Sequence, residues 1–198
     1  MMKKLIFDQA FWTEKYQTGQ TGWDLGMVSP PIQAYIDQLD NKDASILIPG
    51  AGNSYEAAYL FEQGFKNVSV MDIAKEPLEN FKQRVPEFPA HQLIQQDFFE
   101  HIGQYDLIIE QTFFCALDPS LRVSYIDKMK SLLKDGGKLI GLLFDFRLDD
   151  QGPPFGGSKD AYTIDFEKHF NFNTFESCYN SIKPRQGREL FIIFEKKK

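Results

Sequence analysis

Apolar and polar residues follow two different periodicities along this chain, and these periodicities predict its regular structure. Short apolar runs bounded by glycine or polar residues indicate buried strands, whereas apolar residues three and four positions apart indicate amphipathic helices. From residue 45 onward the two patterns alternate. The alternation predicts strands at 45–49, 67–71, 91–95, 105–110 and 138–144, and helices at 54–63, 74–83 and 118–134.

The two ends of the chain are predicted separately. The spacing of Phe7, Phe11 and Trp12 predicts a short helix at 7–18, and Ser29 is expected to cap a helix that opens on Pro30-Pro31. Helix 118–134 should close at Gly136-Gly137. A loop rich in glycine and proline at 148–160 precedes a predicted helix at 163–170 and strands at 172–179 and 188–195.

Strands that alternate with helices predict a doubly wound α/β sheet, because crossovers between parallel strands are right-handed. The two closing strands have no helix between them and should therefore pair as an antiparallel hairpin at one edge. We expect a single-domain Rossmann-like α/β fold over residues 1–198, with a mostly parallel seven-stranded sheet and helices on both faces. That is the arrangement of the class I methyltransferases.

The segment ILIPGAGNSYE, residues 46–56, combines a buried strand, a glycine turn and the start of a helix. Glycine is needed there because a side chain would fill the space that a ligand must enter. Asp72 ends the next strand about twenty residues later, where such folds place an acid that binds ribose hydroxyls. Tyr55 stands where a dinucleotide fingerprint requires glycine. The turn therefore suits a nucleoside without phosphates, and S-adenosylmethionine is the expected cofactor.

Charge and composition exclude several classes of partner. The formal net charge of −6 on 198 residues, with acids and bases interspersed, argues against nucleic acid. No apolar stretch approaches transmembrane length, so no membrane partner is expected. Cys115 and Cys178 have neither metal-ligand spacing nor a disulfide pattern, which predicts a cytoplasmic protein without a metal. Cys115 is expected to be a packing residue, and the chain a monomer.

Six segments carry a resemblance to a known family: FWTEKYQTGQTGWDLG, ILIPGAGNSYEAAYL, VMDIA, QQDFFE, LIIEQTFFCALDPSLR and GPPFGG. With these segments the chain resembles the thiopurine S-methyltransferase family, and within it the thiol and halide methyltransferases of plants and bacteria. The resemblance implies an enzyme that uses S-adenosylmethionine, releases S-adenosylhomocysteine and needs no metal.

The resemblance also implies a cofactor site. Gly50 and Gly52 would let the backbone approach the methionyl group, and Asp72 would bind the ribose. Asp97 would accept from the adenine amino group, with Phe98 on the ring. The first 40 residues would cover the cofactor, which places an aromatic cover over the core at 45–198. Its aromatic positions fall on Trp12, Tyr16 and Trp23.

Residues near the transferred methyl are implied in the same way. Glu110 and Gln111 would lie beside the methionyl group and the methyl, and Arg122 would lie on the acceptor side. Gln111 stands where plant relatives carry a tyrosine. Asp145 follows the fifth strand at the carboxyl edge of the sheet, where ligands bind, and is a further acceptor-side candidate.

We expect methyl transfer to a small soft nucleophile by in-line displacement, with Arg122, Gln111 and Asp145 as catalytic candidates. The acceptor would be a thiol, a thiopurine, sulfide, thiocyanate or a halide. A methyltransferase for nucleic acid or protein, and a non-catalytic module that binds S-adenosylmethionine, remain alternatives. Pro153-Pro154-Phe155 resembles a motif of nucleic-acid amino methyltransferases, but that motif follows the fourth strand. Here it should stiffen the loop over the acceptor pocket, with Phe155 lining it.

Overall fold

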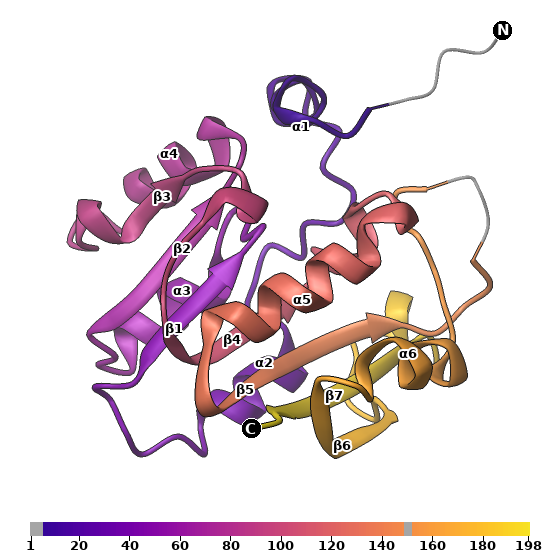
Figure 1. Ribbon diagram of the computed structural model, residues 1–198. Coiled ribbons are helices and arrows are strands. Elements are labelled where there is room, and N and C mark those ends of the chain that lie inside the picture. The colour runs from indigo at the N-terminus through magenta and orange to yellow at the C-terminus, as the bar shows by residue number, and fades with distance from the viewer. Residues whose placement is uncertain (1–5, 149–151) are drawn as a thin grey trace, which may run out of the picture.

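The fold is a seven-stranded sheet with the strand order β3-β2-β1-β4-β5-β7-β6 (Figure 1). The computed structural model describes residues 6–148 and 152–198, so the first five residues of the predicted cover and part of the predicted loop at 148–160 lie outside it. Strands β1 to β5 pair in parallel, and β7 runs antiparallel to both β5 and β6. The predicted class I methyltransferase fold is confirmed. The strands are β1 (Ser45–Pro49), β2 (Asn67–Asp72), β3 (Leu93–Gln95), β4 (Tyr105–Gln111), β5 (Leu133–Phe144), β6 (Phe170–Ser177) and β7 (Glu189–Lys196).

Helices cover both faces of the sheet. One face packs on α5 and α6, which lie in front of the sheet in Figure 1, through Tyr125, Met129 and Phe166. The other face packs on α2, α3 and α4, through Ile32, Leu60 and Phe81. The helices are α1 (Gln9–Gln17), α2 (Pro30–Ile36), α3 (Tyr55–Glu62), α4 (Lys75–Arg84), α5 (Arg122–Leu132) and α6 (Lys159–Phe166).

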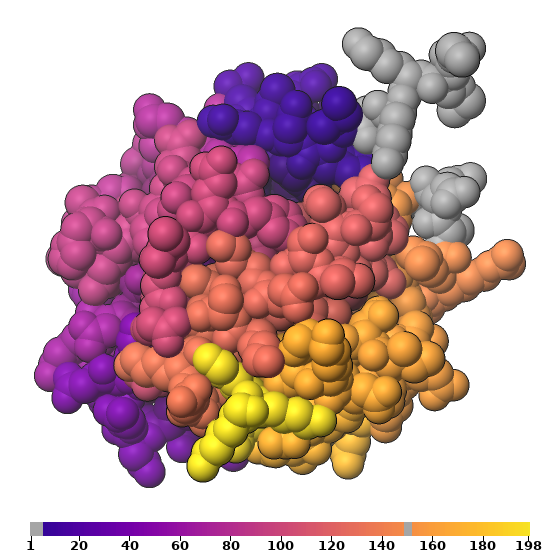
Figure 2. Space-filling view, viewed as in Figure 1, coloured from indigo at the N-terminus to yellow at the C-terminus, as the bar shows by residue number. Residues whose placement is uncertain are grey.

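Helix α1 covers neither face and contains no fully buried residue. It lies at the end of the molecule toward which the parallel strands point, and Figure 2 shows it in indigo, packed against the magenta part of the chain. Glu76 of α4 holds it there, because one carboxylate oxygen accepts from Thr13 Oγ1 at 3.2 Å and the other from Gln17 Nε2 at 2.8 Å.

The predicted end of α5 and the predicted start of α6 are both wrong. Helix α5 ends at Leu132, and Gly136-Gly137 lies inside β5, because buried Leu133 already pairs with Tyr105. The glycines belong to the irregular register that follows this pair. Helix α6 starts four residues earlier than predicted, because Ser158 Oγ caps it by accepting from Ala161 N at 3.3 Å. Strand β6 is shifted accordingly.

Smaller differences affect the third strand and the cap of α2. Residues 90–92 form a 3₁₀ turn, which leaves only 93–95 for β3. Ser29 precedes α2 but its side chain makes no capping bond. Its backbone N–H donates instead to Glu56 Oε1 at 3.0 Å. Within the described ranges, no helix has both the length and the apolar character to cross a membrane.

Candidate active site

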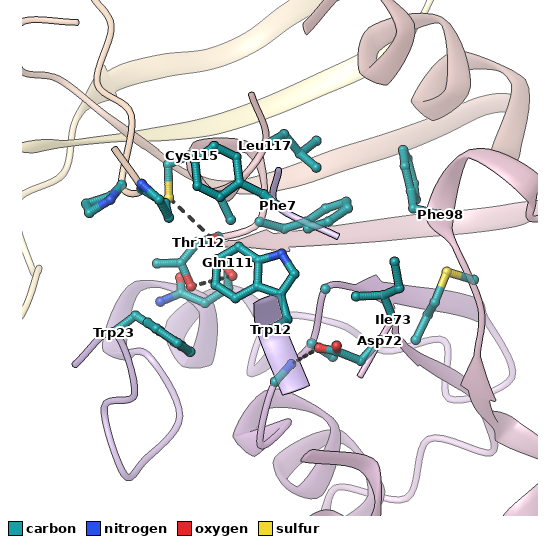
Figure 3. Close-up of a pocket in the computed structure, with 18 of the residues that line it drawn as sticks. Phe7, Trp12, Trp23, Asp72, Ile73, Phe98, Gln111, Thr112, Cys115 and Leu117 are labelled. Carbon is teal, nitrogen blue, oxygen red and sulfur yellow. Dashed lines mark hydrogen bonds between the residues drawn. The ribbon is translucent and has the colours of Figure 1, made fainter. Parts of the chain in front are cut away.

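A cavity of about 780 Å³ opens at the carboxyl ends of the parallel strands. Its lining includes the turn after β1 and the ends of β2 and β4, at the point where the strand order reverses and where α/β folds bind ligands. Its volume is in the range of small-molecule sites. Figure 3 shows two ends of this cavity, with Asp72, Ile73 and Phe98 on one side and Thr112, Cys115 and Trp23 on the other.

The glycine turn after β1 forms part of the first end. Gly50 and Gly52 have φ angles of +55° and +52°, in the left-handed region that favours glycine. A Cβ on Gly50 would lie 2.1 Å from a ring carbon of Phe113, so the turn and the segment after β4 touch closely. Gly52 N donates to Asp72 Oδ2 at 2.9 Å. The turn is therefore held by the acid that was predicted to bind ribose.

Asp72 is buried, and its second carboxylate oxygen accepts from Ala74 N at 2.9 Å. Burial raises the pKa of Asp72 to about 6, although the backbone donors oppose the shift. Asp97 also lines this end, and its Oδ1 accepts from Phe99 N at 2.8 Å. Phe98 lines the wall beside it. Each carboxylate oxygen that accepts one backbone bond keeps a lone pair for a ligand donor.

Aromatic rings from the N-terminal segment cover the cavity. Trp12, Tyr16 and Trp23 all line it, as does Phe7. Trp23 makes edge-to-face contacts with Trp12 at 5.5 Å and Tyr16 at 5.9 Å between ring centroids. Phe7 continues the series to Phe155 at 5.6 Å. The predicted aromatic cover is thus present as one connected layer.

The end of β4 brings Gln111, Thr112 and Phe113 to the cavity, with Thr112 at φ +58°. Gln111 Oε1 is buried and has no hydrogen-bond partner among the described residues. Glu110, which was expected beside the methionyl group, is fully buried and absent from the lining.

Glu110 lies beneath this turn and anchors it. Its Oε1 accepts from Phe113 N at 2.8 Å and Phe114 N at 2.9 Å, and its Oε2 accepts from Tyr125 Oη at 2.5 Å. Burial raises the pKa of Glu110 to about 7. This carboxylate therefore shapes the site without facing it.

A charged group that the sequence analysis missed, the half-buried Arg185, lines the second end. Arg185 donates to Trp23 O at 2.7 Å, lies 3.4 Å from Glu189 Oε1, and lines the cavity together with Glu56. Burial raises the pKa of both Glu56 and Glu189. Arg185 lies in a connection between strands, and Glu56 reads as an ordinary acid in the first turn of a helix, so no local pattern marked either one.

Besides Glu110, three other sequence candidates are not brought to the cavity lining. Arg122 and Asp145 line a separate pocket of about 330 Å³, where Arg122 Nη2 donates to Gly156 O at 2.6 Å. Phe155 is buried behind the lining, which Pro153 and Pro154 form instead. Phe155 N donates to Cys115 O at 2.7 Å, so the loop is tied to the turn after β4. Cys115 is buried as expected and also lines the cavity.

The residues at the first end fit S-adenosylmethionine. The turn at Gly50 and Gly52 lines the cavity, although the Phe113 ring fills the space beside Gly50. Asp72 and Asp97 offer carboxylates to hydroxyl and amino donors. Aromatic faces of Trp12 and Trp23 suit a sulfonium. In the part of the chain that the structure describes, no group of three or more His, Cys, Asp or Glu residues could hold a metal ion.

Comparisons with known proteins agree with this geometry. The sequence profile of the family described as thiopurine S-methyltransferase matches residues 7–197. A probable thiol methyltransferase 2 of Arabidopsis thaliana is 31% identical over 156 residues, which are 76% of this chain and 69% of the relative. Thiocyanate methyltransferase 1 of Brassica oleracea is 26% identical over 188 residues, covering 92% and 83%. Among solved structures, the 1,6-didemethyltoxoflavin-N1-methyltransferase of Burkholderia thailandensis, with bound S-adenosylhomocysteine, superimposes with a TM-score of 0.77 at 16% identity, covering 96% of this chain and 87% of that one.

Proposed function

The chain belongs to the thiopurine S-methyltransferase family, and on that premise we propose that it transfers the methyl group of S-adenosylmethionine to a small soft nucleophile, a thiol or another sulfur compound. One observation carries the proposal. The first end of the cavity, at Asp72, and the second end, at Arg185, belong to one cavity under one aromatic cover. We call them the cofactor end and the acceptor end. Two small molecules can therefore meet inside it.

The cofactor end works by position and charge. The turn at Gly50 and Gly52 lines the cofactor end, and Asp72 accepts hydrogen bonds from ribose hydroxyls. S-adenosylmethionine supplies a methyl group on a positively charged sulfur, which leaves as a neutral thioether. Trp12 and Trp23 stabilise positive charge through their faces and exclude water. Holding two reactants in line contributes roughly 7–11 kcal/mol to such a reaction, so positioning is the main task of these side chains.

The acceptor end favours an anionic sulfur. A free thiol has a pKa of about 8.5, so some thiolate is present at neutral pH without a dedicated base. Arg185 supplies a positive charge in this part of the cavity. Burial raises the pKa of Glu56 and Glu189, and Arg185 opposes that shift in both. The guanidinium is the group in this part of the cavity that would attract a thiolate.

The aromatic cover weighs against larger substrates. A nucleic acid or a protein would have to pass α1 and the segment at Pro153 and Pro154, which line the cavity with apolar side chains. The net charge of −6 also disfavours a polyanion. A non-catalytic module that only binds the cofactor would not need a cation at the second end.

Turnover of S-adenosylmethionine to S-adenosylhomocysteine tests the proposal directly. The acceptor panel is hydrosulfide, benzenethiol, a thiopurine, thiocyanate and iodide, and cofactor binding is followed in parallel by calorimetry. We expect turnover with sulfur acceptors and its loss in Asp72→Ala. Cofactor binding without turnover on any acceptor would refute the transfer proposal, and absence of cofactor binding would refute the cofactor assignment as well.

Arg185 is tested by a charge-neutral exchange. Arg185→Gln combined with Glu189→Gln removes the cation without leaving its buried partner charged. We expect the KM for thiolates to rise about tenfold, the value of a lost charge-assisted contact, with the cofactor Kd unchanged. An unchanged KM would show that Arg185 only holds the Trp23 segment.

A further inference from the structure

Asp24 brings a carboxylate to the cavity wall without a cation beside it. It directly follows Trp23 of the aromatic cover, and it is half-buried and lines the cavity. Its Oδ1 accepts from Gly26 N at 2.7 Å, and its Oδ2 accepts from Asn53 Nδ2 and Tyr55 Oη. Among the described residues, no Lys, Arg or His forms an ion pair with it. Its charge is therefore available to a cation bound in the cavity.

The glycine turn after β1 holds Asp24 near the acid that was predicted to bind ribose. Gly52 N donates to Asp72 Oδ2 at 2.9 Å. The next residue of the turn, Asn53, donates its side-chain N–H to Asp24. Burial raises the pKa of Tyr16, and the charges of Asp72 and Asp24 both add to the shift, so this ring lies near both carboxylates. Consecutive residues of one turn thus hold two carboxylates that line the cavity.

The cofactor carries one cation besides its sulfonium, the α-ammonium group of its amino-acid part. Hydrogen bonds between an ammonium and an ionised carboxylate are among the strong ones. In the proposed reaction the ribose lies at Asp72 and the transferred methyl faces Arg185, so the amino-acid part branches from the sulfur between them. Asp24 connects these two places. Asn53 ties it to the glycine turn, and Arg185 donates to the carbonyl of its neighbour Trp23.

Glu56 is the competing carboxylate in this part of the cavity. It also lines the cavity, but it is almost fully buried and its Oε1 accepts from Ser29 N at 3.0 Å. Burial raises the pKa of Glu56, and the charge of Asp24 adds to the shift. Because burial disfavours the charged form of Glu56, the half-buried Asp24 is better suited to bind a cation.

We propose that Asp24 binds the α-ammonium group of S-adenosylmethionine and of its product. This bond lets the site distinguish the cofactor from adenosine thioethers that lack an amino-acid part, such as 5′-methylthioadenosine. Because Asp24 adjoins Trp23, the same bond fastens the aromatic cover over the occupied site. The inference rests on the proposed function, whose cofactor it takes as given.

Calorimetry with two ligands tests this role without any turnover. The first ligand is S-adenosylhomocysteine, and the second is its deaminated analogue, which has a hydrogen in place of the α-ammonium group. We expect Asp24→Asn to weaken the binding of S-adenosylhomocysteine about 10- to 100-fold, since one charge-assisted bond is lost. The Kd of the deaminated analogue should not change, which also shows that the variant is folded. Asp24→Ala should behave alike, and it places no amide opposite Asn53 Nδ2.

Two further variants identify the group that binds the ammonium. Asp37→Asn is the matched control, because Asp37 accepts from Tyr59 Oη much as Asp24 accepts from Tyr55 Oη but does not line the cavity. It should leave both Kd values unchanged. Glu56→Gln should weaken S-adenosylhomocysteine less than Asp24→Asn does.

Several outcomes would overturn the role of Asp24. They are an unchanged Kd for S-adenosylhomocysteine in both Asp24 variants, an equal loss for the two ligands, and a larger selective loss in Glu56→Gln. Absence of S-adenosylhomocysteine binding to the wild type would refute the cofactor assignment together with this inference. If the selective loss is found but no acceptor is turned over, Asp24 keeps its role and only the methyl-transfer proposal fails.

Discussion

The two ends of the cavity are built in different ways: the first, at Asp72, is the proposed cofactor end, and the second, at Arg185, is the proposed acceptor end. At the cofactor end, the decisive contacts are backbone N–H groups that bond to a carboxylate, as Gly52 and Ala74 do with Asp72. These groups belong to adjacent parallel strands and the turns that follow them. At the acceptor end, side chains from distant segments meet, and the bond from Arg185 to Trp23 O joins residues 162 positions apart.

This difference explains how one fold can keep a cofactor and change its acceptor. Backbone contacts at strand ends tolerate few substitutions, because glycine conformations and strand register both constrain them. Side chains such as Arg185 and Gln111 can change without disturbing the sheet. We therefore expect variants at the cofactor end to abolish binding, and variants at the acceptor end to alter selectivity.

The largest effect is expected where the two ends touch. Gly50→Ala would place a Cβ 2.1 Å from the Phe113 ring at a positive φ, so either the glycine turn or the segment after β4 must move. We expect cofactor affinity to fall about 100-fold, as strain and overpacking combine. Gly64→Ala has the same backbone strain in open space and should leave the affinity unchanged. Equal losses in both variants would contradict the clash.

The next effect concerns Glu110, which anchors the turn after β4. Phe113 of that turn packs against Gly50, so the turn contacts both ends of the cavity. The pKa of Glu110 is raised from 4.5 to about 7, so the native state holds this proton more tightly than the unfolded chain. The contribution of Glu110 to the free energy of unfolding is thus lost as the pH rises from about 4.5 through 7, by up to about 3 kcal/mol. Urea denaturation at pH 5 and pH 8 measures it.

Glu110→Gln isolates that contribution, because the amide keeps an oxygen for the backbone donors but does not titrate in this range. We expect the stability difference between pH 5 and pH 8 to shrink by the same amount in this variant. Glu100→Gln, on the exposed 3₁₀ turn after β3, is the control and should keep the full difference. An unchanged difference in Glu110→Gln would mean that the carboxyl does not titrate in this window.

A moderate effect is expected from Asp72 at the cofactor end alone. In the proposed complex, ribose hydroxyls donate to the ionised carboxylate of Asp72, whose pKa is about 6. The affinity for S-adenosylhomocysteine should therefore fall about tenfold per pH unit below pH 6. Asp72→Asn should bind more weakly at pH 8 and lose this pH dependence. Calorimetry between pH 5 and pH 8 measures both, and a slope that persists in the variant would assign it to another group.

The smallest effect is expected at the cover, which spans both ends. Glu76→Ala removes the bonds from Thr13 and Gln17 to α4 while leaving the aromatic contacts in place. Since these bonds are exposed or half-buried, cofactor dissociation should become only about two- to threefold faster. Glu79→Ala on the same helix, where Glu79 pairs with Lys75, is the control. Stopped-flow fluorescence of Trp12 and Trp23 can follow the release of the cofactor. Identical dissociation rates in Glu76→Ala and the wild type would show that the bonds of Glu76 to α1 do not hold the cover closed.

The cofactor end could be predicted because its signals are local. Gly50, Gly52 and Asp72 stand at fixed positions relative to buried strands. All the residues before β4 that were predicted to bind the cofactor line the cavity. Glu110 was misplaced because adjacent residues at a strand end point to opposite sides. The pattern marked both Glu110 and Gln111, but it did not show that one faces α5 and the other the cavity.

The acceptor end could not be predicted in the same way. Arg122 was chosen by resemblance, yet it donates to Gly156 in a neighbouring pocket, while Arg185 occupies the cavity. Arg185 lies in the connection before β7, where no periodicity marks the direction of its side chain. Only the packing of the segment at 152–157 and of the connection before β7 decides which guanidinium reaches the cavity.

The sequence by itself determined the strand and helix alternation, the glycine turn, the acid at Asp72 and the aromatic cover, because each depends on residues close together in the chain. The tertiary structure alone decided that Arg185 lines the acceptor end, that Glu110 is buried beneath the turn after β4, and that Gln111 Oε1 has no partner among the described residues. Those features depend on side chains that meet across the carboxyl edge of the sheet. Local periodicity does not show which distant side chains contact one another, because the packing of the whole core determines how the crossovers bring their segments together.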